Sequence, residues 1–338
     1  MKKTQIAFFD TKPYDRQFFD IANQKHNFII HYFESRLNPD SAALAKGFDA
    51  VCAFVNDDVS TEVVNKLAEL GIKLIVMRCA GFNNVDLNAA NAHGITVARV
   101  PAYSPHAVAE YTLGLILALN RHLPKAYNRV RDGNFTINGL LGFDLYGKTI
   151  GVVGTGKIGK TFIELLQGFG MNVLAYDPYE DQDLKDRKLC TYVPLTEIFE
   201  KSDIISLHCP LSPENMHMIN HSTIAQMKKG VMLVNTSRGK LIDTSALIDA
   251  LKARKLSGAA LDVYEEEAGY FFEDNSAGGI ADDILARLLT FPNVLVTSHQ
   301  AFFTVEALTN ISDITLQNVK DFEDGISSAL VLTQKRNS

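Results

Sequence analysis

A glycine-rich motif is the first feature of the sequence that could bind a ligand. Residues 154–159 read Gly-Thr-Gly-Lys-Ile-Gly, directly after the apolar run 149–153. A G-x-G-x-x-G motif between a strand and a helix predicts a dinucleotide-binding turn, with the helix N-terminus facing the phosphates. Gly154 would allow the tight turn, Gly156 the approach of pyrophosphate, and Gly159 the packing of helix on strand.

An acidic residue at the end of the next apolar run supports this reading. Asp177 lies 18 residues after Gly159 and follows the run 172–176. A carboxylate at this place can accept hydrogen bonds from ribose hydroxyls and would repel a 2′-phosphate. Lys157 is the nearby cation. We therefore expect NAD rather than NADP, the alternative being that Asp177-Pro178 is only a solvated turn.

Three further polar sites each follow an apolar run: Arg238, the acid run Glu265–Glu267, and His299. The carboxyl ends of parallel strands meet at one edge of a sheet, where ligands bind. There an arginine can hold a carboxylate, an acid can orient a histidine, and the histidine can transfer a proton. This set suits hydride transfer between a nicotinamide cofactor and a 2-oxo or 2-hydroxy acid. The alternatives are an arginine paired with Asp243 and a solvated acid loop, and spacing alone does not select one of the three acids.

These sites need elements to position them, and the chain alternates short apolar runs with amphipathic stretches throughout. That pattern predicts parallel sheets covered by helices. The expected strands of the first series are 6–9, 28–33, 50–55, 74–77 and 96–97. The six of the second series are 149–153, 172–176, 204–207, 231–235, 259–263 and 294–297. The main helices expected are 16–25, 61–70, 87–93, 107–123, 157–169, 195–201, 224–227, 244–254 and 305–322.

Composition excludes several classes of protein. Thirty-three Lys and Arg against 39 Asp and Glu give a formal charge of −6, which argues against a surface for nucleic acid or anionic membrane. The four cysteines form no C-x-x-C pair and no zinc-like cluster, so we expect no metal site and reduced thiols. No apolar stretch suits a signal peptide or a membrane span. We expect a soluble cytoplasmic protein.

Several motifs in order along the chain resemble the D-isomer-specific 2-hydroxyacid dehydrogenase family. They are residues 154–159, 207–211, 234–239, 261–264 and 298–299. The chain is most similar to lactate-type members of the family, by residues 78–84, 101–105, 270–274 and 299–304. The resemblance implies an α/β fold of two doubly wound parallel-sheet (Rossmann-like) domains. We expect an NAD-binding domain, residues 102–299, inserted in a flavodoxin-like substrate domain, residues 1–101 and 300–338.

The resemblance also implies roles for individual residues. Arg238 would bind the substrate carboxylate and polarise the carbonyl, and His299 would be the general acid/base. Glu267 would be the acid bound to His299, because the family's glutamate lies five residues after the position of Asp262. The implied cofactor contacts are Lys157, Ile158, Asp177, Cys209, Pro210, Asn215, Thr236, Ser237, Arg238 and Asp262, with Cys209 acting through its backbone. The other implied substrate contacts are the amides of Ala80 and Gly81 and the walls Tyr103 and Phe302.

The expected reaction is the reduction of pyruvate by NADH to the D-2-hydroxy acid, the chirality coming from the resemblance alone. Bulky walls favour pyruvate, and the alternatives are glyoxylate, hydroxypyruvate or a branched 2-oxo acid. A nucleotide-sensing corepressor-like protein is the alternative from another class. The wide apolar coverage of residues 107–123 suggests burial by a second subunit, and the family implies a homodimer or homotetramer.

Overall fold

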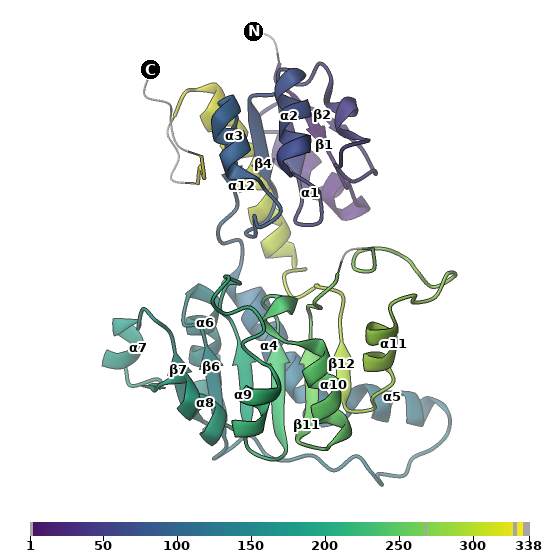
Figure 1. The fold of residues 1–338 in the computed structure, drawn as a ribbon, viewed down its shortest axis with the longest axis vertical. Coiled ribbons are helices and arrows are strands. Elements are labelled where there is room, and N and C mark those ends of the chain that lie inside the picture. The colour runs from purple at the N-terminus through teal and green to yellow at the C-terminus, as the bar shows by residue number, and fades with distance from the viewer. Residues whose placement is uncertain (1–2, 268, 327–329, 334–338) are drawn as a thin grey trace. The chain divides into compact units, whose positions relative to one another are not determined.

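The computed structural model describes residues 3–267, 269–326 and 330–333. They divide into a terminal unit, formed by the residues up to Ser104 and from Phe303 onward, and an inserted unit, Pro105–Phe302. Each unit contains one sheet in which every paired strand runs parallel to its neighbour (Figure 1). The expected α/β class with two parallel sheets is confirmed.

The borders between the units lie at 104/105 and 302/303, each three residues after the expected border at 101/102 or 299/300. Tyr103 stays with the terminal unit, where its carbonyl accepts a hydrogen bond from Asn310 Nδ2 at 2.6 Å. Phe302 stays with the inserted unit, where its ring centroid lies 6.5 Å from that of Phe272. Each of these two residues thus has a contact within its own unit.

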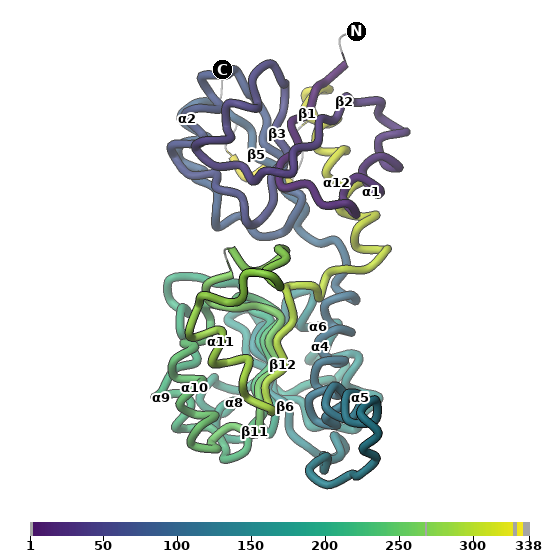
Figure 2. The backbone as a smooth tube through the Cα atoms, turned by 90° about the vertical axis from the view of Figure 1, so that its right-hand side faces the viewer, coloured from purple at the N-terminus to yellow at the C-terminus, as the bar shows by residue number. Residues whose placement is uncertain are grey.

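The terminal unit has a five-stranded sheet in the order β2-β1-β3-β4-β5. The strands are β1 (Gln5–Phe8), β2 (Ile29–Tyr32), β3 (Ala50–Ala53), β4 (Leu74–Met77) and β5 (Thr96–Arg99). The helices are α1 (Pro13–Asn23), α2 (Thr61–Glu69), α3 (Leu87–His93) and α12 (Val305–Glu323), with a 3₁₀ helix at Ala42–Ala45. Every residue of β3 and β4 is buried, as expected for central parallel strands covered on both faces. The C-terminal helix α12 packs against α1 of this unit (Figure 2).

The inserted unit has a seven-stranded sheet in the order β12-β11-β10-β9-β6-β7-β8. The strands are β6 (Thr149–Val153), β7 (Asn172–Tyr176), β8 (Thr191–Tyr192), β9 (Ile204–Leu207), β10 (Val231–Asn235), β11 (Leu256–Leu261) and β12 (Val294–Val296). The strand order reverses between β6 and β9, which is the switch point where dinucleotides bind in such sheets. The expected count of six strands was wrong, because β8 has two residues and no apolar run of its own to reveal it.

Helices cover both faces of the inserted sheet (Figure 2). They are α4 (Pro105–Asn120), α5 (Leu123–Arg131), α6 (Lys157–Leu166), α7 (Gln182–Asp186), α8 (Leu195–Lys201), α9 (His221–Gln226), α10 (Thr244–Lys252) and α11 (Asp283–Leu289). The single helix expected over 107–123 ends at Asn120, because His122 takes a left-handed conformation with φ +51° and α5 begins after it. The helix expected over 157–169 ends at Leu166 and continues as a 3₁₀ turn. Helices α5, α7 and α11 were not predicted as separate helices.

Candidate active site

The glycine turn after β6 has a shape that only glycine allows at two of its positions. Gly154 has φ +98°, and a Cβ on it would lie 2.6 Å from Cys209 N. A Cβ on Gly159 would lie 2.0 Å from Gly154 O, so helix α6 packs directly on the turn. A Cβ on Gly156 would meet nothing within 4 Å, which leaves open space in front of the turn. The turn therefore fits a pyrophosphate lying against its backbone.

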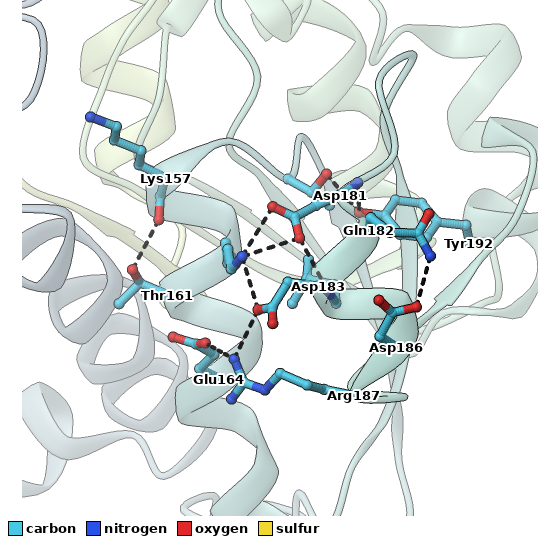
Figure 3. A network of polar contacts seen from close by, with 12 residues as sticks. Lys157, Thr161, Glu164, Asp181, Gln182, Asp183, Asp186, Arg187 and Tyr192 are labelled. Atoms are coloured by element: carbon cyan, nitrogen blue, oxygen red, sulfur yellow. Dashed lines mark hydrogen bonds and ion pairs between the residues drawn. The ribbon is translucent and has the colours of Figure 1, made fainter.

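Helix α6 presents its N-terminus at this open space. Its N-cap residue is Gly156, which has no side chain to bind the first backbone N–H groups. Unsatisfied N–H groups and the helix dipole make such an end a binding site for phosphate. Lys157 is exposed and its ammonium points away from the neighbouring polar network, whereas its carbonyl accepts from Thr161 Oγ1 at 2.9 Å (Figure 3). Ile158 is half-buried on the first turn.

A network of charged side chains fixes α6 against α7. Lys160 Nζ lies 3.1 Å from Asp181 and 2.9 Å from Asp183, and Arg187 pairs with Asp183 at 3.0 Å. Arg187 also contacts Glu164 of α6 (Figure 3). These pairs are partly exposed and each stabilises little alone, but together they hold α6 against α7.

Asp177 lies at the end of β7 and faces the glycine turn. One carboxylate oxygen accepts the Thr155 amide at 2.7 Å, and the other accepts the Tyr179 amide at 2.8 Å. Tyr192 Oη donates to Thr155 Oγ1 at 2.9 Å, so β8 supports the same turn. Each carboxylate oxygen keeps a further lone pair, and the side chain can still accept from a ribose hydroxyl.

The loop after β9 lies on the other side of the turn. Cys209 accepts Ser237 Oγ at 2.5 Å through its carbonyl, and burial raises the pKa of its thiol to about 11. The thiol therefore stays protonated at neutral pH. Asn215 closes the loop, since its Nδ2 donates to Pro210 O at 2.7 Å and its Oδ1 accepts the Ser212 amide at 2.7 Å. These two hydrogen bonds show that Asn215 stabilises the conformation of the loop.

The residues after β10 lead to the arginine. Thr236 is buried and its hydroxyl lies 2.8 Å from that of Thr112 on α4. The Ser237 amide donates to Asn235 Oδ1 at 3.0 Å, and Asn235 Nδ2 donates to Arg238 O at 2.9 Å. The buried asparagine at the end of the strand therefore fixes the backbone on both sides of the turn.

Arg238 is half-buried and keeps most of its donors. Its Nη1 donates to Ser237 O at 2.7 Å, and within the described residues no carboxylate forms an ion pair with it. Asp243, the alternative partner, instead caps α10 by accepting the Ala246 amide at 3.1 Å. The planar fork of the guanidinium is therefore available to an anionic ligand.

His299 forms its main contact with Glu267. The distance from His299 Nδ1 to Glu267 Oε2 is 2.8 Å, and the two side chains are 19% and 16% exposed. Glu267 Oε1 accepts the Tyr264 amide at 3.1 Å, which fixes the carboxylate. Because Nδ1 is bound, Nε2 is the nitrogen left for a substrate.

Asp262 holds the turn that carries His299, a role that the sequence analysis did not assign to it. Its fully buried carboxylate accepts Thr297 Oγ1 at 2.6 Å, the Gln300 amide at 2.9 Å and the Ala301 amide at 2.8 Å. Burial raises the pKa of this group. The expected cofactor contact of Asp262 stays a prediction, whereas its hydrogen bonds fix the backbone on both sides of His299.

Each member of the acid run has its own basic partner. Glu265 pairs with His217, Glu266 lies 3.3 Å from Lys240, and Glu267 pairs with His299. Glu265 and Glu267 are therefore held by histidines, whereas Glu266 is a solvent-exposed member of the run. The sequence analysis did not assign a role to His217 or Glu265, and no motif in the sequence marks them.

The structure adds Phe272 to the surroundings of His299. Its ring centroid lies 5.8 Å from that of His299 and 6.5 Å from that of Phe302. Its φ of +66° is unfavourable for an aromatic residue, and such strain persists where the surroundings fix it. The aromatic run Tyr270–Phe272 was a signal for it, but sequence does not indicate which ring turns toward the histidine.

The remaining predicted residues belong to the terminal unit. Ala80 O accepts from Arg99 Nη1 at 2.8 Å and Gly81 O lies 3.2 Å from Cys79 Sγ, whereas neither amide has a hydrogen-bond partner among the described residues. Two successive free amides can bind an anion. Tyr103 is half-buried.

A buried arginine supports this loop from the end of β4. Arg78 is 2% exposed and its Nη2 donates to Asp10 O at 2.7 Å. Its guanidinium lies 4.7 Å from the ring centroid of Phe8 and 4.4 Å from that of Phe54. The backbone that leads to Ala80 is therefore rigidly anchored.

These features define a class of protein. A dinucleotide-binding sheet whose neighbouring strand ends carry an arginine and a carboxylate-bound histidine is typical of nicotinamide-dependent oxidoreductases. In the described part of the chain, no set of three or more His, Cys, Asp or Glu side chains is placed to hold a metal ion. Nor does any helix described there combine the length and apolarity that a membrane crossing needs.

Comparison with known proteins gives the family. Residues 113–301 match the model of the D-isomer specific 2-hydroxyacid dehydrogenase, NAD binding domain. A 2-hydroxyacid dehydrogenase homolog of Haemophilus influenzae is 53% identical over 95% of this chain and 97% of its own length. The D-lactate dehydrogenase of Escherichia coli is 50% identical over 95% and 97%. A solved structure of the pyruvate reductase of Chlamydomonas reinhardtii has 44% identity and a TM-score of 0.90, covering 97% of this chain and 98% of that one.

The chain therefore belongs to the D-isomer specific 2-hydroxyacid dehydrogenase family. It is an NAD-binding oxidoreductase, and the expectation of NAD is confirmed.

The close packing at Gly159 gives a prediction about the cofactor. Gly159→Ala places a methyl group against Gly154 O, and overpacking of this kind costs about 1–3 kcal/mol. We expect the Kd for NADH to rise about tenfold, as measured by fluorescence titration. Gly168→Ala is the matched control, because a Cβ there meets nothing within 4 Å. An unchanged Kd in folded Gly159→Ala would contradict the role of the turn.

Proposed function

We propose that this protein is an NAD-dependent D-lactate dehydrogenase that reduces pyruvate. The observation that carries the proposal is the His299–Glu267 pair next to a strand end that bears Arg238 without an acidic partner among the described residues. The three residues follow β12, β11 and β10, which are neighbours in the sheet. The names of the relatives, a D-lactate dehydrogenase and a pyruvate reductase, support the same substrate.

The proposed mechanism assigns one task to each residue. Arg238 binds the substrate carboxylate with its free donors and polarises the carbonyl. When bound, the nicotinamide supplies the hydride that reduces the carbonyl carbon. Protonated His299 donates the Nε2 proton to the carbonyl oxygen, while Glu267 holds Nδ1 and stabilises the imidazolium. In the reverse direction neutral His299 accepts the hydroxyl proton.

Other residues are proposed to bind the same substrate. The free amides of Ala80 and Gly81 suit the carboxylate. Phe302 and Tyr103 are proposed walls for the methyl group, and Phe272, which contacts both His299 and Phe302, is added to them. Aromatic side chains in these roles would disfavour a branched substrate, and we therefore propose pyruvate.

A screen of 2-oxo acids tests the proposal. NADH oxidation is followed with pyruvate, glyoxylate, hydroxypyruvate and a branched 2-oxo acid, and the product is resolved on a chiral column. We expect the highest kcat/KM with pyruvate and a D-product. A higher kcat/KM with another acid would identify that acid, and not pyruvate, as the preferred substrate. If NADH is oxidised with none of the four acids, a nucleotide-sensing, corepressor-like role would be favoured.

We further propose that the protein works as a homo-oligomer, a dimer or a tetramer. The large apolar side chains of α4 are buried or half-buried, so most of the exposed apolar surface lies beyond this helix. It lies on α5 and the segment that follows, where Ile137 and Leu141 are 81% and 91% exposed. The exposed set comprises Leu123, Tyr127, Val130, Phe135, Ile137, Leu141 and Tyr146. Such a patch suits a second copy of the chain.

The double variant Ile137→Asp/Leu141→Asp tests this patch. We expect light scattering after gel filtration to give a smaller assembly than the wild type, because two charges would be buried at the interface. Ile21→Asp, at an exposed position of the terminal unit, is the control and should leave the mass unchanged. A monomeric wild type, or an unchanged mass in the double variant, would remove the patch from the interface.

A further inference from the structure

The loop that carries Arg238 is held between two other segments of the inserted unit. On one side, a Cβ on Gly239 would lie 1.8 Å from Tyr264 O, so the loop touches the backbone before the acid run. On the other side, the His217 amide donates to Lys240 O at 2.8 Å. A shift of Arg238 therefore requires at least one of these segments to move.

His217 and Glu265 join the two segments. His217 Nε2 lies 2.5 Å from Glu265 Oε1. The other carboxylate oxygen accepts Thr244 Oγ1 at 2.9 Å and the Thr244 amide at 3.2 Å, at the first residue of α10. Glu265 thus connects a histidine from the loop after β9 with the helix that follows the arginine loop.

The backbone of His217 is in an unfavourable conformation that its neighbours maintain. Its φ is +52°, in the left-handed region that residues other than glycine rarely adopt. Asn220 Nδ2 donates to His217 O at 2.9 Å and helps to fix it. The side chains of His217 and Glu265 are 37% and 21% exposed, so the pair is partly open to solvent and is not a buried charge pair. Strain of this kind concentrates at functional sites.

Glu265 also links this pair to the acid/base pair. It lies two residues before Glu267, which holds His299. One short segment therefore contacts the arginine loop through Glu265 and the histidine turn through Glu267. The relative position of Arg238 and His299 depends on this segment.

We propose that His217 and Glu265 are a positioning pair that fixes the Arg238 loop relative to His299. This inference rests on the proposed function, in which Arg238 binds the 2-oxo acid. Neither residue contacts the substrate. Loss of the pair lets the arginine loop shift, which weakens binding of the carboxylate more than it slows the proton transfer.

Two substitutions of His217 test the proposal. His217→Leu removes the hydrogen bond, and we expect KM for pyruvate to rise about tenfold while kcat changes less than about threefold. His217→Gln keeps a donor near the position of Nε2 and should restore KM to within about threefold of the wild type. His221→Leu is the matched control, because His221 is exposed and its contact to Asp249 at 3.4 Å lies away from the arginine loop.

A double-mutant cycle tests whether the two residues act together. His217→Leu and Glu265→Ala break the same contact, and Glu265→Ala also breaks the bonds to Thr244, so we expect the double variant to have the KM of Glu265→Ala alone. Additive effects, an unchanged KM in both single variants, or a loss confined to kcat would each overturn the proposal. Glu265→Gln is the conservative control, because its amide oxygen can accept from Thr244 and its NH2 group can hydrogen-bond His217, and it should keep KM within about threefold of the wild type.

A binding measurement separates this inference from the proposed function. Oxamate, an unreactive analogue of pyruvate, is titrated into the complex of each variant with NADH. We expect its Kd to rise in His217→Leu by the same factor as KM. If the wild type turns over no 2-oxo acid, the proposed function fails, while an unchanged oxamate Kd in His217→Leu overturns the positioning role independently.

Discussion

Replacement of His299 by asparagine lowers kcat for pyruvate reduction by about 10²–10⁴-fold, the usual contribution of a general acid. Asparagine is chosen because His299 has φ +53° and asparagine tolerates the left-handed region better than most residues. The variant keeps the backbone contacts of the turn but has no group that donates a proton at neutral pH. Steady-state kinetics measure the loss, and a titration with NADH should give a Kd within about threefold of the wild type.

Glu267→Gln is the companion variant. It keeps the shape of the side chain that contacts His299 at 2.8 Å but removes its charge, so we expect a smaller fall in kcat than in His299→Asn. His221→Asn, at an exposed position of the same unit, should have wild-type activity. A rate in His299→Asn close to that of the wild type would exclude His299 as the acid.

Replacement of Arg238 by glutamine lowers kcat/KM for pyruvate by about 10²–10³-fold, because a charge-assisted, bidentate contact to the carboxylate is lost. We expect a higher KM and a lower kcat together, since the guanidinium both binds the carboxylate and polarises the carbonyl. The kcat/KM of Arg238→Lys should lie between those of the wild type and Arg238→Gln, because lysine keeps the charge but not the planar fork of the guanidinium.

The control for Arg238 is an exposed arginine of the inserted unit. Arg287 lies 4.8 Å from the ring of Phe291 on the surface of α11, and Arg287→Gln should keep the wild-type kcat/KM. Thermal unfolding checks that both variants fold. A normal KM for pyruvate in folded Arg238→Gln would exclude the arginine as the anchor of the substrate.

The sequence predicts the parts of this protein that follow from periodicity and from glycine. Continuous apolar runs such as β10 are buried on both faces of a parallel sheet, so their positions could be predicted within a residue or two, whereas β11 begins at Leu256, three residues before the expected start. The glycine turn was recognisable because Gly154 and Gly159 are in contact with backbone that any side chain would displace. The strand ends after β10 and β12 then placed Arg238 and His299 at one edge of the sheet.

The parts that sequence did not predict depend on the direction of side chains in loops. Nothing in the order Glu265-Glu266-Glu267 indicates that His217 and His299 approach this run from two different segments. Phe272 points toward His299 because of an unfavourable backbone angle, which has no sequence signature outside glycine. The hydrogen bonds of Asp262 to the histidine turn are likewise tertiary contacts between residues far apart in the chain.

The contact between α1 and α12 has a consequence for the order of folding. These two helices pack together in the terminal unit, yet the whole inserted unit lies between them in the sequence. During synthesis the inserted unit is complete before α12 leaves the ribosome, so it can fold while α1 still lacks its partner. We therefore expect the terminal unit to complete its fold last, when α12 reaches α1, and a compact inserted unit would shorten the chain loop that separates these two helices.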